Sequence, residues 1–216
     1  MDTLKIDLHV HSRYSRDCST TFREIVAYAK MRGLDGVAIT DHDVIEGALK
    51  FAKRDWGIIV IPGIEVSTCA GHILGLNVSE PITPNLTPAE TIEKVHDAGG
   101  IAVVAHPSAI YKGGVGLGAL PSLRADAVEV INSSVIPFHL LTYLNRKVAL
   151  KVGLPQTAGS DSHIPETIGL AYTLIHAESS LDEIIESIRK GRTEPYGKPI
   201  PWSLRLKIIR QRKKRE

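Results

Sequence analysis

Short apolar runs alternate with amphipathic stretches along most of the chain. Eight runs of strand length predict strands over residues 4–11, 35–43, 57–67, 71–77, 101–107, 126–132, 156–163 and 170–177. Between them, apolar positions at helical spacing predict helices over residues 20–33, 45–54, 87–100, 137–152 and 180–191. The helix from Thr87 is the best defined, because Thr87 suits an N-cap, Pro88 the first turn, and Glu90 the capping box.

Repeated alternation of strands and helices predicts an α/β fold with a largely parallel sheet. Seven or so short strands in about 200 residues favour a small, TIM-like barrel over a doubly wound sheet. No internal repeat or linker interrupts residues 1–197, so we expect one barrel domain followed by a basic C-terminal tail, residues 198–216.

Composition is that of an ordinary globular protein, with 43% hydrophobic and 23% charged residues. The two cysteines, Cys18 and Cys69, form no disulfide framework, which is typical of a reducing compartment. The N-terminus lacks the pattern of a signal peptide, and no apolar run approaches the roughly 20 residues of a transmembrane helix. We therefore expect a cytoplasmic protein.

Charge is unevenly distributed. The tail holds eight Lys or Arg against Glu216, which leaves residues 1–197 with 18 basic and 23 acidic side chains, a net charge of −5. Such a tail suits nucleic acid or an anionic membrane surface. We favour the alternative, a last element packed by Trp202, Leu204 and Leu206 and followed by a solvated end, because terminal charge runs are usually disordered.

Histidines and acids fall where the predicted strands end. His9 and His11 are two residues apart on a strand, so their side chains point the same way. The carboxyl ends of parallel barrel strands meet on one face, where chemistry is usually placed. We expect nine side chains to converge there: His9, His11, Asp17, His42, Glu65, His72, His106, Asp161 and His163. So many titratable groups share one pocket only if multivalent cations offset them.

The ligand types restrict the metal. Imidazoles with carboxylates and no thiolate suit Zn²⁺, Mn²⁺ or Fe. Nine candidates exceed the coordination shell of one ion and fit two or three, with Glu65 as a bridge. Because clustered ions hold a hydroxide nucleophile and neutralise charge on a phosphoryl group, hydrolysis is the predicted chemistry. His96, His139 and His176 fall elsewhere and are interpreted as structural or surface residues.

The ordered motifs HVH, TDHD, PGIEVS, HILGL, AHP, VEVIN and GSDSH resemble the PHP family, named for polymerase and histidinol phosphatase domains. The resemblance runs from His9 to His163 and on into the following strand. It implies a distorted seven-stranded (β/α)7 barrel binding up to three metal ions, with the nine residues above as ligands. It also implies that Asp41 orients a ligand imidazole and that Asn132 lies near the substrate.

Within the family, GIEVS and HILGL look like the branch of nucleotide phosphoesterases and 5′-to-3′ RNA exonucleases. Those relatives generally carry a helical insertion that is absent here, since only residues 77–100 separate HILGLN from IAVVAHP. The missing segment favours a phosphomonoesterase acting on a small phosphorylated metabolite or nucleotide. A 5′-to-3′ exonuclease on short oligonucleotides is the alternative, for which the basic tail is the argument.

Two basic residues are candidates for holding a substrate phosphate. Arg13 lies two residues after His11, and a guanidinium fork matches phosphate oxygens, although a solvated loop arginine is an equal alternative. Lys112 belongs to a glycine-rich loop, residues 111–120, which is either a mobile flap or a plain surface loop. The loop's G-x-G-x-x-A spacing, from Gly114 to Ala119, is no dinucleotide fingerprint, because six residues separate it from the strand ending at Pro107.

Two other function classes fit less well. Amidohydrolases also place H-x-H after a first barrel strand. However, an amidohydrolase would have a longer chain and often a metal-bridging lysine mid-barrel, where this chain has Glu65. A non-catalytic subunit of an RNA-processing complex would tend to lose metal ligands, whereas all nine are present here.

Overall fold

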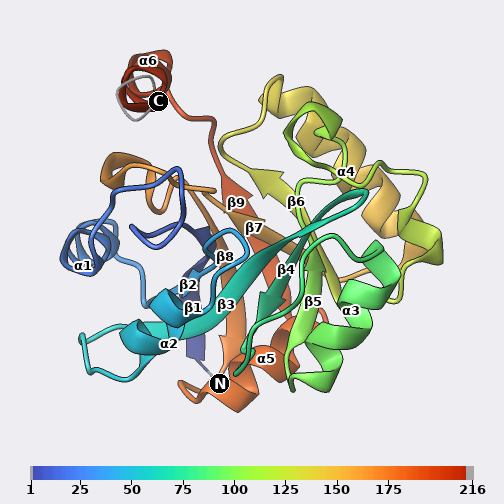
Figure 1. Cartoon of the computed structure of the whole chain (residues 1–216), viewed down its shortest axis with the longest axis horizontal. Coiled ribbons are helices and arrows are strands. Elements are labelled where there is room, and N and C mark those ends of the chain that lie inside the picture. The colour runs from blue at the N-terminus through green and yellow to red at the C-terminus, as the bar shows by residue number, and fades with distance from the viewer. Residues whose placement is uncertain (1, 213–216) are drawn as a thin grey trace.

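The eight apolar runs and one polar segment form a single nine-stranded sheet in a computed structural model, which describes residues 2–212 (Figure 1). The strands are β1 Asp2–Val10, β2 Gly36–Ile39, β3 Ile59–Thr68, β4 Gly71–Leu76, β5 Ile101–Val104, β6 Ala127–Asn132, β7 Gln156–Gly159, β8 Ala171–Ala177 and β9 Thr193–Gly197. Their order across the sheet is β7-β6-β5-β4-β3-β2-β1-β8-β9. The eight predicted strands are confirmed, and the sheet curls into a nearly closed barrel.

The expected count of seven strands is wrong. The β1–β2, β2–β3, β5–β6 and β6–β7 pairs are parallel, while β4, β8 and β9 pair antiparallel with their neighbours. The β3–β4 hairpin therefore adds a strand with no helix between, and β9 returns antiparallel to β8 after the helix over Leu181–Arg189. No apolar run predicts β9, because its sequence TEPYG is polar, partly exposed and contains Pro195.

Helices surround the sheet: α1 Phe22–Met31, α2 Glu46–Ala52, α3 Pro88–Asp97, α4 Phe138–Val152, α5 Leu181–Arg189 and α6 Trp202–Arg212. The first five lie in the predicted segments. Thr87 caps α3 in the expected capping box with Glu90, and Thr21 and Glu24 do the same for α1. No helix within residues 2–212 is long and apolar enough to cross a membrane.

The carboxyl ends of β1 and β7 meet and close the barrel at one end. The Asp161 N–H donates to the His9 carbonyl at 2.8 Å, and the His11 N–H donates to the Ser162 carbonyl at 3.1 Å. Gly159 makes this approach possible, since a Cβ there would lie 2.3 Å from the His9 Cβ. This contact, the seam between β1 and β7, brings the HVH and GSDSH motifs side by side.

The tail folds as α6, at the same end of the barrel and opposite the N-terminus (Figure 1). The expectation that Trp202 and Leu206 pack inward is wrong, because they are 72% and 53% exposed. Only Leu204 of the three is partly buried. The last basic residues, Lys213, Lys214 and Arg215, lie outside the described residues.

Candidate metal centre

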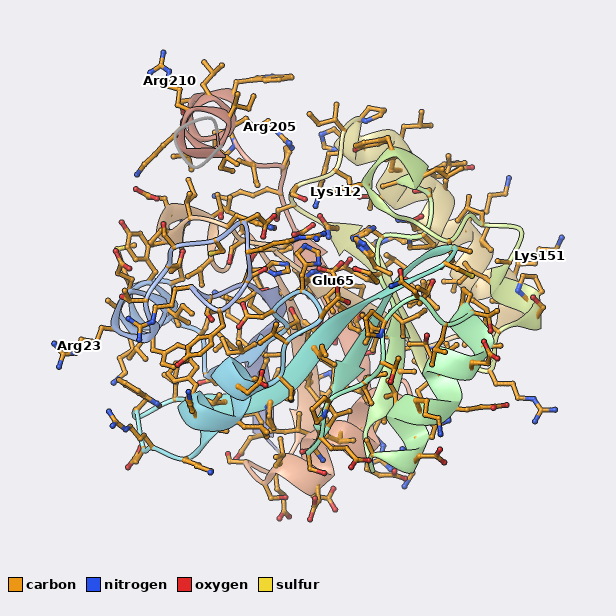
Figure 2. All side chains as sticks on the ribbon, viewed as in Figure 1. Arg23, Glu65, Lys112, Lys151, Arg205 and Arg210 are labelled. Carbon is orange, nitrogen blue, oxygen red and sulfur yellow. The ribbon has the colours of Figure 1, made fainter. Side chains whose placement is uncertain are left out.

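All nine predicted ligands gather at the closed end of the barrel, around Glu65 at its centre (Figure 2). His9, Glu65 and His72 lie on strands, and the others lie in the loops directly after strands. Most are fully buried, while Asp17, His42 and His72 are partly accessible. The strand-end argument therefore located the cluster.

Glu65 divides its two carboxylate oxygens between two sets of imidazoles. Oε1 lies 2.9 Å from His72 Nδ1 and 3.2 Å from His106 Nε2. Oε2 lies 3.1 Å from His9 Nε2, 3.2 Å from His11 Nε2 and 3.3 Å from His42 Nδ1. A carboxylate with separate ligand sets on its two oxygens has the arrangement of a bridge between two metal ions.

Asp161 keeps one oxygen for the centre. Its Oδ2 accepts hydrogen bonds from Lys112 Nζ at 2.5 Å, Ser134 Oγ at 2.8 Å and Asn132 Nδ2 at 3.1 Å. Its Oδ1 faces His11 Nε2 and His163 Nδ1, each at 3.5 Å. The three donors therefore fix the carboxylate so that Oδ1 points at the ligand nitrogens.

The remaining ligands complete a third group. His163 Nε2 lies 2.9 Å from Asp17 Oδ2, and the His11 and His42 rings have centroids 4.7 Å apart. Three sets place one ligand atom per residue within 4.8 Å of one another: His9, His11 and Asp161; His42, Glu65 and His72; and His11, His42 and His163. Because the sets share His11 and His42, they form one continuous group of candidate metal ligands.

Several buried polar atoms of these nine side chains make no hydrogen bond, although some lie close to a carboxylate oxygen. Among the described residues of the centre, six such atoms are His11 Nδ1, His42 Nδ1, His72 Nδ1, His106 Nδ1, Asp161 Oδ1 and His163 Nε2. Leaving a buried polar atom unsatisfied costs about 1–3 kcal/mol each, so a folded protein rarely tolerates several together. This donor set of imidazoles and carboxylates fits divalent cations such as Zn²⁺, Mn²⁺ or Fe²⁺.

The carboxylates also shift the pKa values of the imidazoles. Burial lowers the pKa of His11, but hydrogen bonds and charge from Asp161 and Glu65 outweigh it and raise the value to about 9. Burial lowers the pKa of His42 to about 4, where the charge of Glu65 only partly offsets it. Although burial opposes ionisation, the surrounding histidines hold the pKa of Glu65 well below its usual range. Glu65 is therefore held in the ionised form that a metal-binding carboxylate needs.

Comparison with known proteins agrees with this geometry. A family model described as PHP-associated matches residues 144–193. The chain is 39% identical over 144 residues to an uncharacterised protein of Methanocaldococcus jannaschii, which covers 60% of this chain and 82% of that protein. The crystal structure of a two-domain protein with a PHP-like metal-dependent phosphoesterase from Bacteroides vulgatus superposes with a TM-score of 0.73. That match covers 99% of this chain and 70% of the other, at 20% identity.

The chain belongs to the PHP family. A shorter match is to the phosphoribosyl 1,2-cyclic phosphate 1,2-diphosphodiesterase of Eggerthella lenta, at 42% identity over 82 residues, 34% of this chain and 31% of that enzyme. The sequence predicted that the helical insertion of the nucleotide phosphoesterase and exonuclease branch is absent between β4 and β5. There the PHP chain has only a loop and α3.

Glu129 is a functional residue of this PHP chain that the sequence analysis missed. Its Oε1 lies 3.0 Å from His9 Nδ1, and its Oε2 accepts from the His106 N–H at 3.0 Å and from Asn132 Nδ2 at 2.9 Å. A carboxylate on Nδ1 fixes the imidazole so that Nε2 faces the metal. The signal was present, since Glu129 is an acid inside the apolar strand AVEVIN.

The non-ligand site residues of this PHP chain have definite positions. Asp41 accepts from the Ser12 N–H at 2.6 Å and the Ser12 hydroxyl at 2.7 Å, and so anchors the loop after β1. Asn132 bonds Glu129 and Asp161. Arg13 is exposed, with its guanidinium 5.8 Å from the Tyr14 ring centroid. Lys112, in contrast, reaches the centre through Asp161.

The cysteines and the other histidines of this PHP chain stay out of the centre. The Cys18 thiol donates to the carbonyls of His11 and His163, and burial raises its pKa to about 11. His96 pairs with Asp126 and His176 with Glu194, while His139 packs beside Phe138. Their interpretation as structural or surface residues is confirmed.

Proposed function

We propose that this chain is a divalent-metal-dependent phosphoesterase that hydrolyses small phosphomonoesters. The observation that carries the proposal is the pair of shared carboxylates: Glu65 faces five imidazoles, and Asp161 carries Lys112 on its outer oxygen. Bound divalent ions at such a site activate water for attack and offset the charge of a transferring phosphoryl group.

The chain's own residues divide the remaining tasks. The buried imidazoles and carboxylates would hold the ions, most of them screened from bulk water. The Lys112 side chain is 27% exposed, and its Nζ, directly on Asp161, is placed to contact a non-bridging phosphate oxygen at the mouth. Glu129 and Asn132 hold His9, His106 and Asp161 in position and need not touch substrate.

The monoester preference rests on the space beside the centre. A pocket of about 220 Å³ opens between Asp161, His163, Lys112 and α6, which suits one small organic group. The 5′-to-3′ exonuclease alternative is supported by a local likeness to a 5′-3′ exoribonuclease of Haemophilus influenzae, 40% identical over 81 residues, and by the basic residues of α6. Both activities would use the same metal-dependent hydrolysis of a phosphate ester.

Product analysis separates the two. A 5′-phosphorylated RNA trinucleotide is incubated with purified protein and Mn²⁺, beside a sample with EDTA. Inorganic phosphate with an intact trinucleotide backbone is the expected product. Released nucleoside monophosphate would instead show diester cleavage and would support the exonuclease.

Removing a ligand should abolish turnover while the fold survives. We expect His9→Ala or Asp161→Asn to lower kcat/KM at least about 10³-fold, because each removes a member of the candidate ligand set formed by His9, His11 and Asp161. Glu194→Gln, an exposed carboxylate on β9, is the control and should retain full activity. Full activity in a metal-loaded, folded His9→Ala protein would contradict the proposal.

A further inference from the structure

A pocket next to the metal centre is walled by apolar side chains of the C-terminal helix. Its volume is about 220 Å³. On the barrel side it is lined by Lys112, Ser134, Ile136, Asp161 and His163. On the other side stand Ile200 and five residues of α6: Trp202, Arg205, Leu206, Ile208 and Ile209. The same pocket therefore touches two metal ligands and an apolar wall.

Hydrogen bonds of Arg205 place α6 at the mouth. Its guanidinium donates from Nε to the Ile200 carbonyl at 3.0 Å and from Nη1 to the Ser134 carbonyl at 2.8 Å. Its Nη2 donates to the carbonyls of Ser133 and Val135 at 3.1 and 3.2 Å. Lys207 adds an ion pair with Glu166. Because the helix is anchored by polar contacts, its apolar side chains are left to face the pocket.

Those apolar side chains are largely exposed, although Arg205 and Lys207 anchor the helix. Trp202, Leu206 and Ile209 are 72%, 53% and 51% exposed, and the Arg205 guanidinium lies 5.9 Å from the Trp202 ring centroid. A tryptophan and two aliphatic side chains together at a pocket rim, beside a catalytic centre, are typical of a site for an organic ligand.

The pocket has a charged part next to the metal centre and an apolar part next to α6. Arg205 commits its donors to four backbone carbonyls, so it adds little capacity to bind a phosphate. Lys112 lies at the inner end, on Asp161, and the outer end is apolar. A ligand with a phosphate at the metals and an apolar group against α6 matches this polarity, whereas a sugar–phosphate strand does not.

We propose that this pocket is the leaving-group subsite, and that the enzyme prefers phosphate esters whose alcohol carries an aromatic or bulky apolar group. The inference rests on the proposed phosphoesterase function. The phosphoryl group lies at the ligand cluster with Lys112 beside it, the P–O bond to the alcohol breaks, and the released alcohol remains in contact with Trp202 and Leu206. Water supplies the oxygen that replaces the alcohol on phosphorus.

The test compares benzyl phosphate with ethyl phosphate on the Mn²⁺-loaded full chain. Both release an unactivated alcohol, so the ratio of their kcat/KM values mainly reports binding of the ring. Burying the additional apolar surface of the ring predicts at least about a tenfold preference for benzyl phosphate, at about 25 cal/mol per Å². In the Trp202→Ala/Leu206→Ala double variant, benzyl phosphate should lose about tenfold more activity than ethyl phosphate.

Two further variants sharpen the result. Arg205→Ala should lower the preference as the double variant does, because it removes the anchor of α6. Leu150→Ala removes a side chain 72% exposed on α4, away from the pocket, and should leave both rates unchanged. An unchanged benzyl-to-ethyl ratio in both α6 variants would overturn the subsite.

Failure of the proposed function would look different. If the wild-type protein turns over neither ester, calorimetric titration of the Mn²⁺-loaded chain with benzylphosphonate and ethylphosphonate tests the subsite alone. Tighter binding of benzylphosphonate, lost in the double variant, would keep the subsite while the esterase proposal falls. Equal affinities would overturn the subsite as well.

Discussion

Individual oxygen atoms at the centre have separate tasks. Asp161 gives Oδ2 to Lys112, Asn132 and Ser134 and keeps Oδ1 for the cluster. Glu129 gives both oxygens to groups that carry or position ligands. Supporting carboxylates of this kind commonly affect metal affinity by about 10–100-fold. The site therefore depends on residues that touch no metal.

Glu129→Gln tests this dependence. The substitution keeps the size of the side chain but replaces an accepting oxygen with an amide, so the bonds to His9 Nδ1 and the His106 N–H cannot both persist. We expect metal affinity to fall about 10–100-fold, measured by calorimetric titration with Mn²⁺. Glu178→Gln, at the exposed start of the loop before α5, should bind as the wild type does. Equal affinity in Glu129→Gln would show that Glu129 has no part in holding His9.

At the residue scale, the sequence was most informative where chemistry and position coincide. Histidines and acids at strand ends predicted the nine ligands, because buried strands rarely carry such groups without a function. Glu129 was not predicted because it lies inside a strand, and its contacts, His9 and the His106 N–H, come from segments far from it in the sequence. The role of Arg205 was not predicted, because three of its carbonyl partners follow β6 and the fourth, Ile200, precedes α6, and no local pattern shows that these segments meet.

Among the elements, the seam between β1 and β7 decides where the ligands meet. Gly159 lies against His9 so closely that a Cβ would be 2.8 Å from the His9 backbone nitrogen and from Glu129 Oε1 as well. A side chain at this position cannot be accommodated by rotating a flexible neighbour. Parallel strand ends were predictable from alternation, but this contact depends on tertiary register.

Gly159→Ala should therefore disturb both stability and the centre. We expect a loss of about 1–3 kcal/mol in the free energy of unfolding, as for an overpacked core, together with weaker metal binding. Urea unfolding and Mn²⁺ titration measure the two effects. Gly118→Ala is the matched control, since nothing lies within 4 Å of a Cβ there. A fully stable Gly159→Ala protein with wild-type metal affinity would contradict the proposed role of the seam.

The same scale explains the errors in the predicted fold. β9 is short, polar and half-exposed, and it exists because the edge of β8 offers hydrogen bonds from Ala171 to Ile175. The tail's alternating apolar and basic residues gave no clear helical face, yet α6 forms and is anchored by Arg205. Both β9 and α6 depend on tertiary contacts, which the local sequence pattern does not reveal.

For the whole molecule, bound metal should contribute to stability. Three strands and four loops supply the candidate ligands, so ions that bind the folded chain join segments from β1 to the loop after β7. A ligand at 100 times its dissociation constant stabilises the native state by about 2.7 kcal/mol. We therefore expect EDTA to lower the Tm by several degrees and Mn²⁺ to restore it, followed by circular dichroism.

The His9→Ala/Glu65→Gln double variant provides the control for that experiment. Its Tm should respond little to EDTA or Mn²⁺, because the shared ligands are gone. A Tm that is the same with EDTA and with Mn²⁺ in the wild-type protein would show that the cluster does not bind the ion in the folded state.

The most direct measurement of the central claim is phosphate release by protein stripped of metal and then titrated with Mn²⁺, using benzyl phosphate as substrate. The account predicts no detectable release from the stripped protein and a rate that rises to saturation as Mn²⁺ is added. Stripped protein that releases phosphate at the full rate would contradict a metal-dependent mechanism. Protein that takes up Mn²⁺ yet releases none from any phosphate ester would contradict the assignment as a phosphoesterase.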